Sequence, residues 1–259
     1  MLLTRGWVHR LHSKQRTQND VVSFFFAAVS VFYGVTLGLI TVAVWTNFSD
    51  AQGKVEREAQ AIAGLYRTAE GFNGTQRTML QGDIMNYTGN VIRVSWPQQR
   101  QGVAQLGQGF MLESMQKHIL SFAPATISDQ ILETQMLSQF NELAEAKHAR
   151  MNSAEAGMPA PIWALVIVGA MLTMAMTWCF DLESQSLHIW MIVFLGSLLG
   201  LIICLTAAMD NPFRGDLSVT ADPYERIYAQ MERTSQRLQA EAQRTHLQGQ
   251  AVSFLAREK

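Results

Sequence analysis

Three long runs of apolar residues mark the chain, at residues 21–45, 162–180 and 187–208, and none of them contains Asp, Glu, Lys or Arg. A helix needs roughly 20 predominantly apolar residues to cross the hydrocarbon core of a bilayer. The runs therefore predict three transmembrane helices, the last two joined as a hairpin by residues 181–186. Buried helices of a soluble protein are the weaker alternative, because uncharged runs of this length are typical of membrane spans.

The rest of the chain has the period of amphipathic helices, with apolar side chains three or four positions apart and little sign of strand. Residues 46–161 are expected to form a helical extramembrane region, and residues 209–259 a helix stop followed by an amphipathic helix. Residues 1–20 are expected to form a basic N-terminal tail. The predicted fold class is an all-α integral membrane protein.

Four short helices are expected within residues 46–161. Capping and turn residues predict their boundaries: a start near Ser49, a turn at Asn73-Gly74, a helix end at Trp96-Pro97 and a cap from Thr126 to Asp129. Helices of this kind either fold as a small bundle of their own or extend the membrane helices, often against copies of the same chain.

The composition narrows the range of partners. Charged residues make up 16% of the chain, against about 25% in soluble domains. The 20 Lys and Arg residues are balanced by 21 Asp and Glu residues, so the chain lacks the basic excess that a nucleic-acid-binding protein needs. The lipid bilayer is therefore an expected partner and nucleic acid is not.

No motif in the sequence indicates catalysis. There is no glycine-rich phosphate loop, no nucleophile elbow and no metal-binding histidine pair. The pairs Glu56/Glu58 and Glu142/Glu145 lie near Lys or Arg at helical spacing, and we interpret them as solvated helix faces. The sequence therefore predicts a protein that is not an enzyme, with no catalytic or metal-binding residues and no cofactor.

Small residues recur at every fourth position of the apolar runs. The glycines among them are Gly34, Gly38, Gly169, Gly196 and Gly200. Small side chains let helix backbones approach closely in a membrane, where lipid gives no hydrophobic drive for association. These glycines are expected to pack helices, either within one chain or between chains.

The third run ends at the sequence Met-Asp-Asn-Pro-Phe-Arg-Gly, residues 209–215. Asp210 ends the apolar run, Pro212 prevents the helix from continuing, and Phe213 is expected to return an aromatic ring to the membrane interface. Gly215 suits a sharp turn that needs a positive φ. The motif is interpreted as a helix stop, and alternatively as a joint that also transmits gating motion.

The same stretch resembles the Asp-x-Pro-Phe-x-Gly hallmark of a family of bacterial membrane proteins with a bestrophin-like domain. Weaker matches follow in the family's order: Phe-Tyr-Gly-Val-Thr-Leu-Gly at 32–38, Glu58 with Leu65-Tyr66-Arg67, Tyr87 with Ser95-Trp96-Pro97, and Pro161-x-Trp163. The chain has Ser95 where the family has Glu, so the role of that acidic residue is not carried over. Family members also show a further span before the Phe-Tyr-Gly motif, where this chain has its basic tail.

The resemblance implies a homo-oligomeric anion channel, because bestrophins are oligomeric anion channels with large cytoplasmic helical regions. The partners that it implies are further copies of the chain and an inorganic anion. It places the pore lining on the first run, at the polar residues Ser23, Ser30, Tyr33 and Thr36. The alternative is a membrane scaffold or sensor whose helical loop binds a partner protein.

Basic residues near the span ends bear on orientation. Four precede the first run and favour a cytoplasmic N-terminus: Arg5, Arg10, Lys14 and Arg16. Six lie on the opposite side of the bilayer: Lys54, Arg57, Lys147, Arg150, Arg214 and Arg226. The larger set predicts a multi-pass protein of the inner (plasma) membrane with its long loop and C-terminus in the cytoplasm. A family-type span missing at the N-terminus would favour the same orientation.

Overall fold

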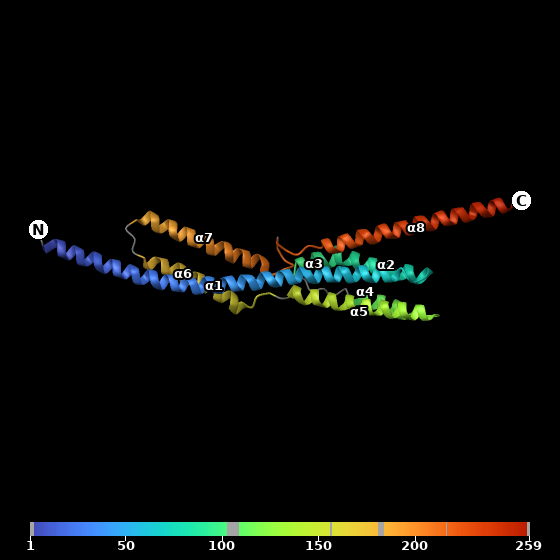
Figure 1. The fold of residues 1–259 in the computed structure, drawn as a ribbon, viewed down its shortest axis with the longest axis horizontal. Coiled ribbons are helices and arrows are strands. Elements are labelled where there is room, and N and C mark those ends of the chain that lie inside the picture. The colour runs from blue at the N-terminus through green and yellow to red at the C-terminus, as the bar shows by residue number, and fades with distance from the viewer. Residues whose placement is uncertain (1–2, 103–108, 156, 181–183, 216, 258–259) are drawn as a thin grey trace. The chain divides into compact units, whose positions relative to one another are not determined.

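The fold is a computed structural model that describes residues 3–102, 109–155, 157–180, 184–215 and 217–257. The described residues form helices and no strand, which confirms the all-α fold class (Figure 1). In chain order these are α1 (Leu3–Ala69), α2 (Gly74–Asn90), the π-helix η1 (Val91–Ser95), α3 (Trp96–Arg100), α4 (Gly109–Leu120), α5 (Ile127–Glu155), α6 (Ala160–Met176), the 3₁₀-helix η2 (Thr177–Cys179), α7 (Gln185–Asp210) and α8 (Asp222–Arg257).

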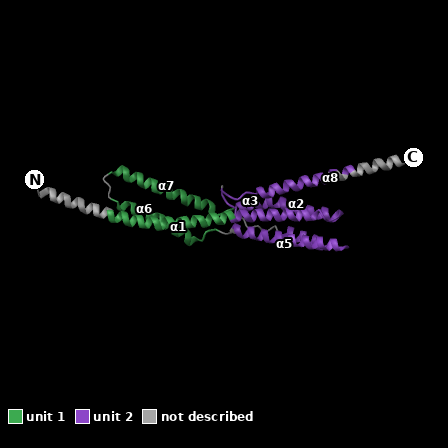
Figure 2. Cartoon of the chain, in the orientation of Figure 1, with its two compact units in different colours: residues 1–49, 156–212 green, residues 50–155, 213–259 purple. Residues whose placement is uncertain are grey.

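The chain divides into two compact units, coloured separately in Figure 2. Unit 1 comprises residues 1–49 and 156–212, and unit 2 comprises residues 50–155 and 213–259. The chain therefore passes from one unit to the other within α1, after α5 and directly after Pro212.

Unit 1 contains the apolar helices. Three helices are long and apolar enough to cross a membrane, and they lie in Asp20–Ala69, Ala160–Cys179 and Gln185–Asp210. Their shared core is small, with Leu37 of α1, Val166 of α6 and Leu199 of α7 buried together. Most other apolar side chains of these helices face outward, as lipid-facing side chains do.

Unit 2 is a helical bundle. The second half of α1 buries Val55 and Ile62, and α2, α4, α5 and α8 bury apolar residues of their own, among them Leu80, Ile84, Met115, Ile119, Met136, Leu143 and Met231. Within α1, α2, α4 and α5 these residues lie four or seven positions apart, which is the helical period from which the helices were predicted.

Two predicted boundaries are confirmed. α2 begins at Gly74, which has a φ of +53° that glycine adopts without strain. α5 begins directly after Thr126, whose hydroxyl accepts a hydrogen bond from the Asp129 backbone N–H at 3.1 Å. The Asp129 carboxylate accepts from the Thr126 N–H at 3.0 Å in return, which completes a capping box.

Two other predicted boundaries are wrong. No helix starts at Ser49, because α1 runs unbroken through this position to Ala69; the following residues favour helix and include no proline. Trp96-Pro97 does not end a helix, since the chain widens into η1 before it and continues as α3. Pro97 lies in the first turn of α3, where its missing N–H costs little.

Candidate functional site

The first half of the 209–215 motif, residues 209–212, belongs to unit 1 and connects two helix ends there. α7 ends at Asp210, whose carboxylate accepts a hydrogen bond from the Met158 backbone N–H at 2.7 Å. Its second oxygen accepts from Trp163 Nε1 at 3.1 Å. Both are charge-assisted bonds, which are stronger than neutral ones. Asp210 therefore holds the end of α7 against the start of α6.

A small cavity lies beside this carboxylate. Its volume is about 150 Å³, and most of its lining is apolar, from Ile40 and Val44 of α1 and Pro159 and Ile162 at the start of α6, with Ala43, Asn47, Gly157, Met158 and Asp210 completing it. Asp210 already accepts two hydrogen bonds at its edge. The cavity is thus part of the same helix junction.

The other half of the motif lies in unit 2. Phe213 is 2% exposed, and its ring packs edge-on against Trp96 with centroids 5.7 Å apart. Trp96 makes a second such contact with Tyr224 of α8, at 5.6 Å. The prediction that Phe213 lies at the membrane interface is wrong, because the buried rings of Trp96 and Tyr224 provide a better apolar partner than an interface.

The turn after Phe213 uses glycine at two points. Gly215 has a φ of +85° and Gly102, in the turn after α3, a φ of +75°. A Cβ added at Gly102 would lie 2.6 Å from Arg214 Cζ, so the guanidinium covers this glycine closely. The motif therefore contacts α3 and the turn after it at two points: the Phe213 ring packs on Trp96, and Arg214 packs on Gly102.

A buried ion pair between α1 and α5 lies next to the Trp96 ring. Glu58 and Arg150 are both 0% exposed, and Arg150 Nε donates to Glu58 Oε2 at 2.6 Å. Arg150 Nη1 also donates to Gln99 Oε1 at 2.6 Å, and the Tyr87 hydroxyl donates to Glu58 Oε1 at 2.8 Å. The guanidinium carbon stands 6.0 Å from the Trp96 ring centroid, within cation–π range.

The interpretation of Glu58 as part of a solvated face is wrong, while Glu56, Glu142 and Glu145 are exposed as expected. Glu58 follows Val55 by three residues and precedes Ile62 by four, so it points into the core with them. Its position on the apolar stripe was the signal that could have revealed it.

Burial and charge set the pKa values in this cluster. Burial alone would lower the pKa of Arg150, but the adjacent Glu58 carboxylate outweighs it and raises that pKa. The pKa values of Tyr87 and Tyr224 are raised well above the usual range by burial and by the charge of Glu58. Burial lowers the pKa of Lys147, against the opposing attraction of Glu58. Arg150 is therefore protonated and both phenols are neutral at physiological pH.

The raised tyrosine pKa values predict a loss of stability in alkali. Above about pH 10 an unfolded tyrosine ionises while the folded one stays neutral, so each contributes a loss of roughly 1.4 kcal/mol per pH unit until the folded pKa is reached. Tyr224→Phe should therefore flatten the fall in unfolding midpoint between about pH 10 and pH 11 relative to the wild type. Equal slopes for the two proteins would contradict the buried, neutral state of Tyr224.

Comparison of the sequence with known protein families identifies the family of this chain. The sequence matches the bestrophin-like domain family over residues 1–224. The chain belongs to this family. No curated protein matches it.

The fold of this bestrophin-like chain is similar to solved structures. One variant of a bacterial bestrophin homologue from Klebsiella pneumoniae aligns with a TM-score of 0.65 and 12% identity, over 80% of this chain and 85% of the homologue. A second variant of the homologue gives a TM-score of 0.66 and 14% identity, over 81% and 86%. A structure described as a membrane protein gives 0.65 and 12%, over 80% and 84%. At such identities the likeness concerns the fold.

The stretches that carried the family resemblance converge in space. Glu58, Tyr87, Trp96 and Phe213 meet in the buried cluster of unit 2. Trp163 and Asp210 are hydrogen-bonded to each other in unit 1. Sequence reasoning missed three members of the unit 2 cluster: Gln99, Arg150 and Tyr224. These three residues lie outside the motifs that carried the family resemblance. Arg150 had been considered only as one of the basic residues that bear on membrane orientation.

The residues expected to line a pore differ in their surroundings. The Tyr33 hydroxyl donates to the Val166 carbonyl of α6 at 2.7 Å, so it is engaged within the chain. Thr36 is bonded to the Phe32 carbonyl of its own helix, as threonines in membrane helices commonly are. Ser23 is exposed, whereas the Ser30 hydroxyl oxygen is buried and finds no hydrogen-bond partner among the described residues.

The five glycines that were expected to pack helices also fall into two groups. A Cβ at Gly169 would lie 2.3 Å from the Tyr33 ring, and one at Gly196 would lie 3.2 Å from Met174 Cε, so these two lie at contacts between helices of one chain. Gly34, Gly38 and Gly200 have no described neighbour within 4 Å of an added Cβ. For these three a packing role between chains stays a prediction.

Gly169→Val is expected to destabilise unit 1. The added side chain collides with the Tyr33 ring and breaks its hydrogen bond to Val166, and overpacking of this kind typically costs about 1–3 kcal/mol. The unfolding midpoint in detergent should fall for Gly169→Val and change little for Gly82→Val, a helical glycine of α2 that has open space around an added Cβ. Equal effects of the two substitutions would contradict the packing of Tyr33 on α6.

The described residues contain no group of three or more His, Cys, Asp or Glu side chains placed to hold a metal ion. One of the two clusters holds a helix junction in unit 1, and the other holds Phe213 in unit 2.

Proposed function

We propose that this bestrophin-like membrane protein is one subunit of a homo-oligomeric ion channel of the inner (plasma) membrane, with inorganic anions as the permeant species. The observation that supports this most is the extent of the shared fold, which covers 80% of this chain and 85% of a bacterial bestrophin homologue. The family match over residues 1–224 supports it from the sequence.

The sparse packing of the apolar helices supports an oligomer. Only 11%, 17% and 11% of their most apolar windows are buried within one chain. A path for ions through a bilayer must be separated from lipid by protein on every side. The helices of a single chain bury too little of one another to enclose such a path. Helices from further copies would complete the wall.

We place the pore lining on α1, with Thr36 as the residue to test first. Ser23 and Thr36 interrupt the apolar surface of α1, whereas the Tyr33 hydroxyl and the Ser30 oxygen are turned toward the chain's own interior. A hydroxyl in a pore replaces part of the hydration shell of a passing ion.

The test is flux into liposomes that contain the purified protein, measured separately for chloride and potassium after the oligomer mass has been determined. A defined oligomer that passes chloride supports the proposal, and Thr36→Val is then expected to alter the chloride rate without altering the mass. A folded oligomer that passes neither ion would overturn it.

The 209–215 motif is proposed to act as a joint as well as a helix stop. Asp210 is bonded within unit 1 and Phe213 is buried within unit 2, with only Asn211 and Pro212 between them. Movement of either anchor must therefore act on the other through two residues. Asp210→Ala should change the flux rate, and an unchanged rate would leave the motif only its role as a helix stop.

The cytoplasmic placement of the long loop and C-terminus is likewise proposed. Of the six basic residues that favoured it, Lys147 and Arg150 are buried, and Arg150 is paired with Glu58. Arg57, Arg214 and Arg226 are exposed, and they support the orientation more directly.

A scaffold or sensor is the second candidate, because unit 2 leaves large apolar side chains uncovered. Phe110 is 77% exposed, and Leu120, Ile127 and Ile131 are also exposed. Apolar side chains on an extramembrane unit often mark an interaction site. A folded protein that passes no ion but binds a partner through these residues would favour this candidate.

A further inference from the structure

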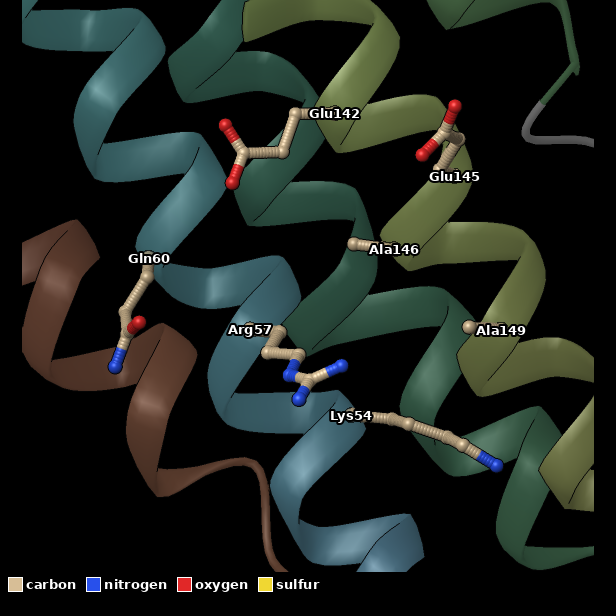
Figure 3. A pocket seen from close by; sticks show the side chains of 7 residues that line it. All are labelled: Lys54, Arg57, Gln60, Glu142, Glu145, Ala146 and Ala149. Carbon is tan, nitrogen blue, oxygen red and sulfur yellow. The ribbon is translucent and has the colours of Figure 1, made fainter.

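A groove runs between α1 and α5 on the outside of unit 2 (Figure 3). Its volume is about 510 Å³. Lys54 and Arg57 extend from α1, and Glu142 and Glu145 extend from α5. Gln60, Ala146 and Ala149 complete the lining. Ala146 and Ala149 have the smallest side chains of the lining, so the α5 side of the groove leaves room for a helix.

The walls of this groove carry opposite charges that do not neutralise each other. Lys54 Nζ donates to the Ser153 hydroxyl at 2.6 Å. Arg57, Glu142 and Glu145 are exposed, and no ion pair joins the two walls among the residues that the structure describes. A ligand that fits must therefore present an acidic edge to α1 and a basic edge to α5.

The outer surface of α8 has these two edges. Glu225 and Glu232 lie seven residues apart on one edge, and Arg226 and Arg233 lie seven apart on the adjacent edge. Seven residues are nearly two helical turns, so each pair shares a line along the helix. Glu225, Arg226 and Arg233 are exposed.

Within unit 2, α5 runs antiparallel to α1. Lys54 is bonded to Ser153, and Thr68 to Gln139 at 2.7 Å, so residue numbers that add to about 207 stand at the same height. Glu145 is therefore level with about residue 62 of α1, and Glu142 with about residue 65.

By contrast, α8 runs parallel to α1. The Tyr224 ring contacts Trp96, which lies against the Arg150 guanidinium bonded to Glu58. The Tyr66 hydroxyl donates to the Met231 carbonyl at 3.4 Å. Both α8 residues are about 165 positions beyond their α1 neighbours. In a cyclic assembly whose axis follows these helices, a neighbouring copy's α8 stands at the same height as the chain's own α8.

We propose that α8 of a neighbouring copy occupies the α1–α5 groove. At equal height, the neighbouring copy's Glu225 comes within about one helical turn of Arg57. Its Arg226 and Arg233 come within about one turn of Glu145 and Glu142. Glu225, Arg226 and Arg233 thus each meet an opposite charge of the groove at one register. The inference rests on the proposed homo-oligomer and is independent of ion conduction.

Cysteine crosslinking between different chains tests this contact. The native Cys179 and Cys204, both exposed, are first replaced by serine. Chains with Ala149→Cys and chains with Glu225→Cys are then co-expressed and oxidised. Crosslinked pairs are expected only in the mixture, and each chain expressed alone should give none, because a disulfide requires Cα atoms closer than about 7 Å.

Charge reversal provides a second measurement on the same contact. Arg57→Glu and Glu225→Arg should each shift the purified oligomer toward monomer at low ionic strength, and the double substitution should restore it. Glu56→Arg, on an exposed position of α1 outside the groove, is the matched control and should leave the mass unchanged.

The outcomes separate the two proposals. An oligomer of wild-type mass that gives no crosslink in the mixture would overturn the α8 contact and leave the oligomer standing. A monomeric wild-type protein would overturn the oligomer itself. Failure of the double charge reversal to restore the mass would also contradict the proposed pairing of Arg57 with Glu225.

Discussion

Arg150→Met is expected to lower the unfolding midpoint of the detergent-purified protein by about 10 °C. The substitution leaves the Glu58 carboxylate fully buried without its cation. Removing one partner of a buried pair typically costs about 3–5 kcal/mol, and about 2–4 °C is lost per kcal/mol in a protein of this size. Gln99 and Tyr87 would lose part of their hydrogen-bonded arrangement at the same time.

The matched control replaces both charges. Glu58→Leu together with Arg150→Met removes the desolvated pair, and such exchanges are commonly neutral or stabilising. The double variant should therefore unfold at a higher temperature than Arg150→Met alone. If the single substitution leaves the midpoint unchanged, Glu58 is not a buried carboxylate dependent on Arg150.

Phe213→Ala is expected to have the second large effect. The ring is buried against Trp96, which in turn contacts Tyr224, and deletion of a buried phenylalanine side chain typically costs about 3–5 kcal/mol. Thermal unfolding, followed by circular dichroism, measures the loss.

A second phenylalanine provides the control. Phe24 of α1 is 84% exposed on an apolar helix, so Phe24→Ala removes the same side chain without opening a cavity and should change the midpoint little. Equal losses for the two substitutions would contradict the burial of Phe213 in unit 2. A Phe213→Leu variant, which keeps most of the apolar volume, should lie between Phe213→Ala and the wild type.

The sequence was most informative where one physical requirement dominates. A bilayer demands long uncharged helices, so three helices of sufficient length and apolarity were correctly predicted. The Thr126–Asp129 capping box and the Asn73-Gly74 turn depend on neighbouring residues only, and both predictions hold. Local rules of this kind need no knowledge of the tertiary structure.

Predictions failed where packing overrides local preference. Ser49 can cap a helix, but a helix already in progress from α1 passes through it. Glu58 was judged by its charged neighbours, whereas its partner Arg150 lies 92 residues away in sequence and comes close only through the fold. Phe213 was placed by its proximity to an apolar run, and its true partner Trp96 was likewise distant in sequence.

The candidate site was predictable in part. The motif residues Glu58, Tyr87, Trp96 and Phe213 were identified from the family resemblance, but nothing in the sequence indicated that they meet. Their convergence depends on how α1, α2, α3 and the start of α8 pack around Arg150, which is a property of the assembled bundle.

The current reversal potential of the protein in a planar bilayer, under a potassium chloride gradient, tests the proposed channel most directly. An anion-selective channel drives the reversal potential toward the equilibrium potential of chloride, and this is the result that we predict. A reversal potential near that of potassium would contradict anion selectivity. The absence of any current from a folded, oligomeric preparation would contradict the channel itself.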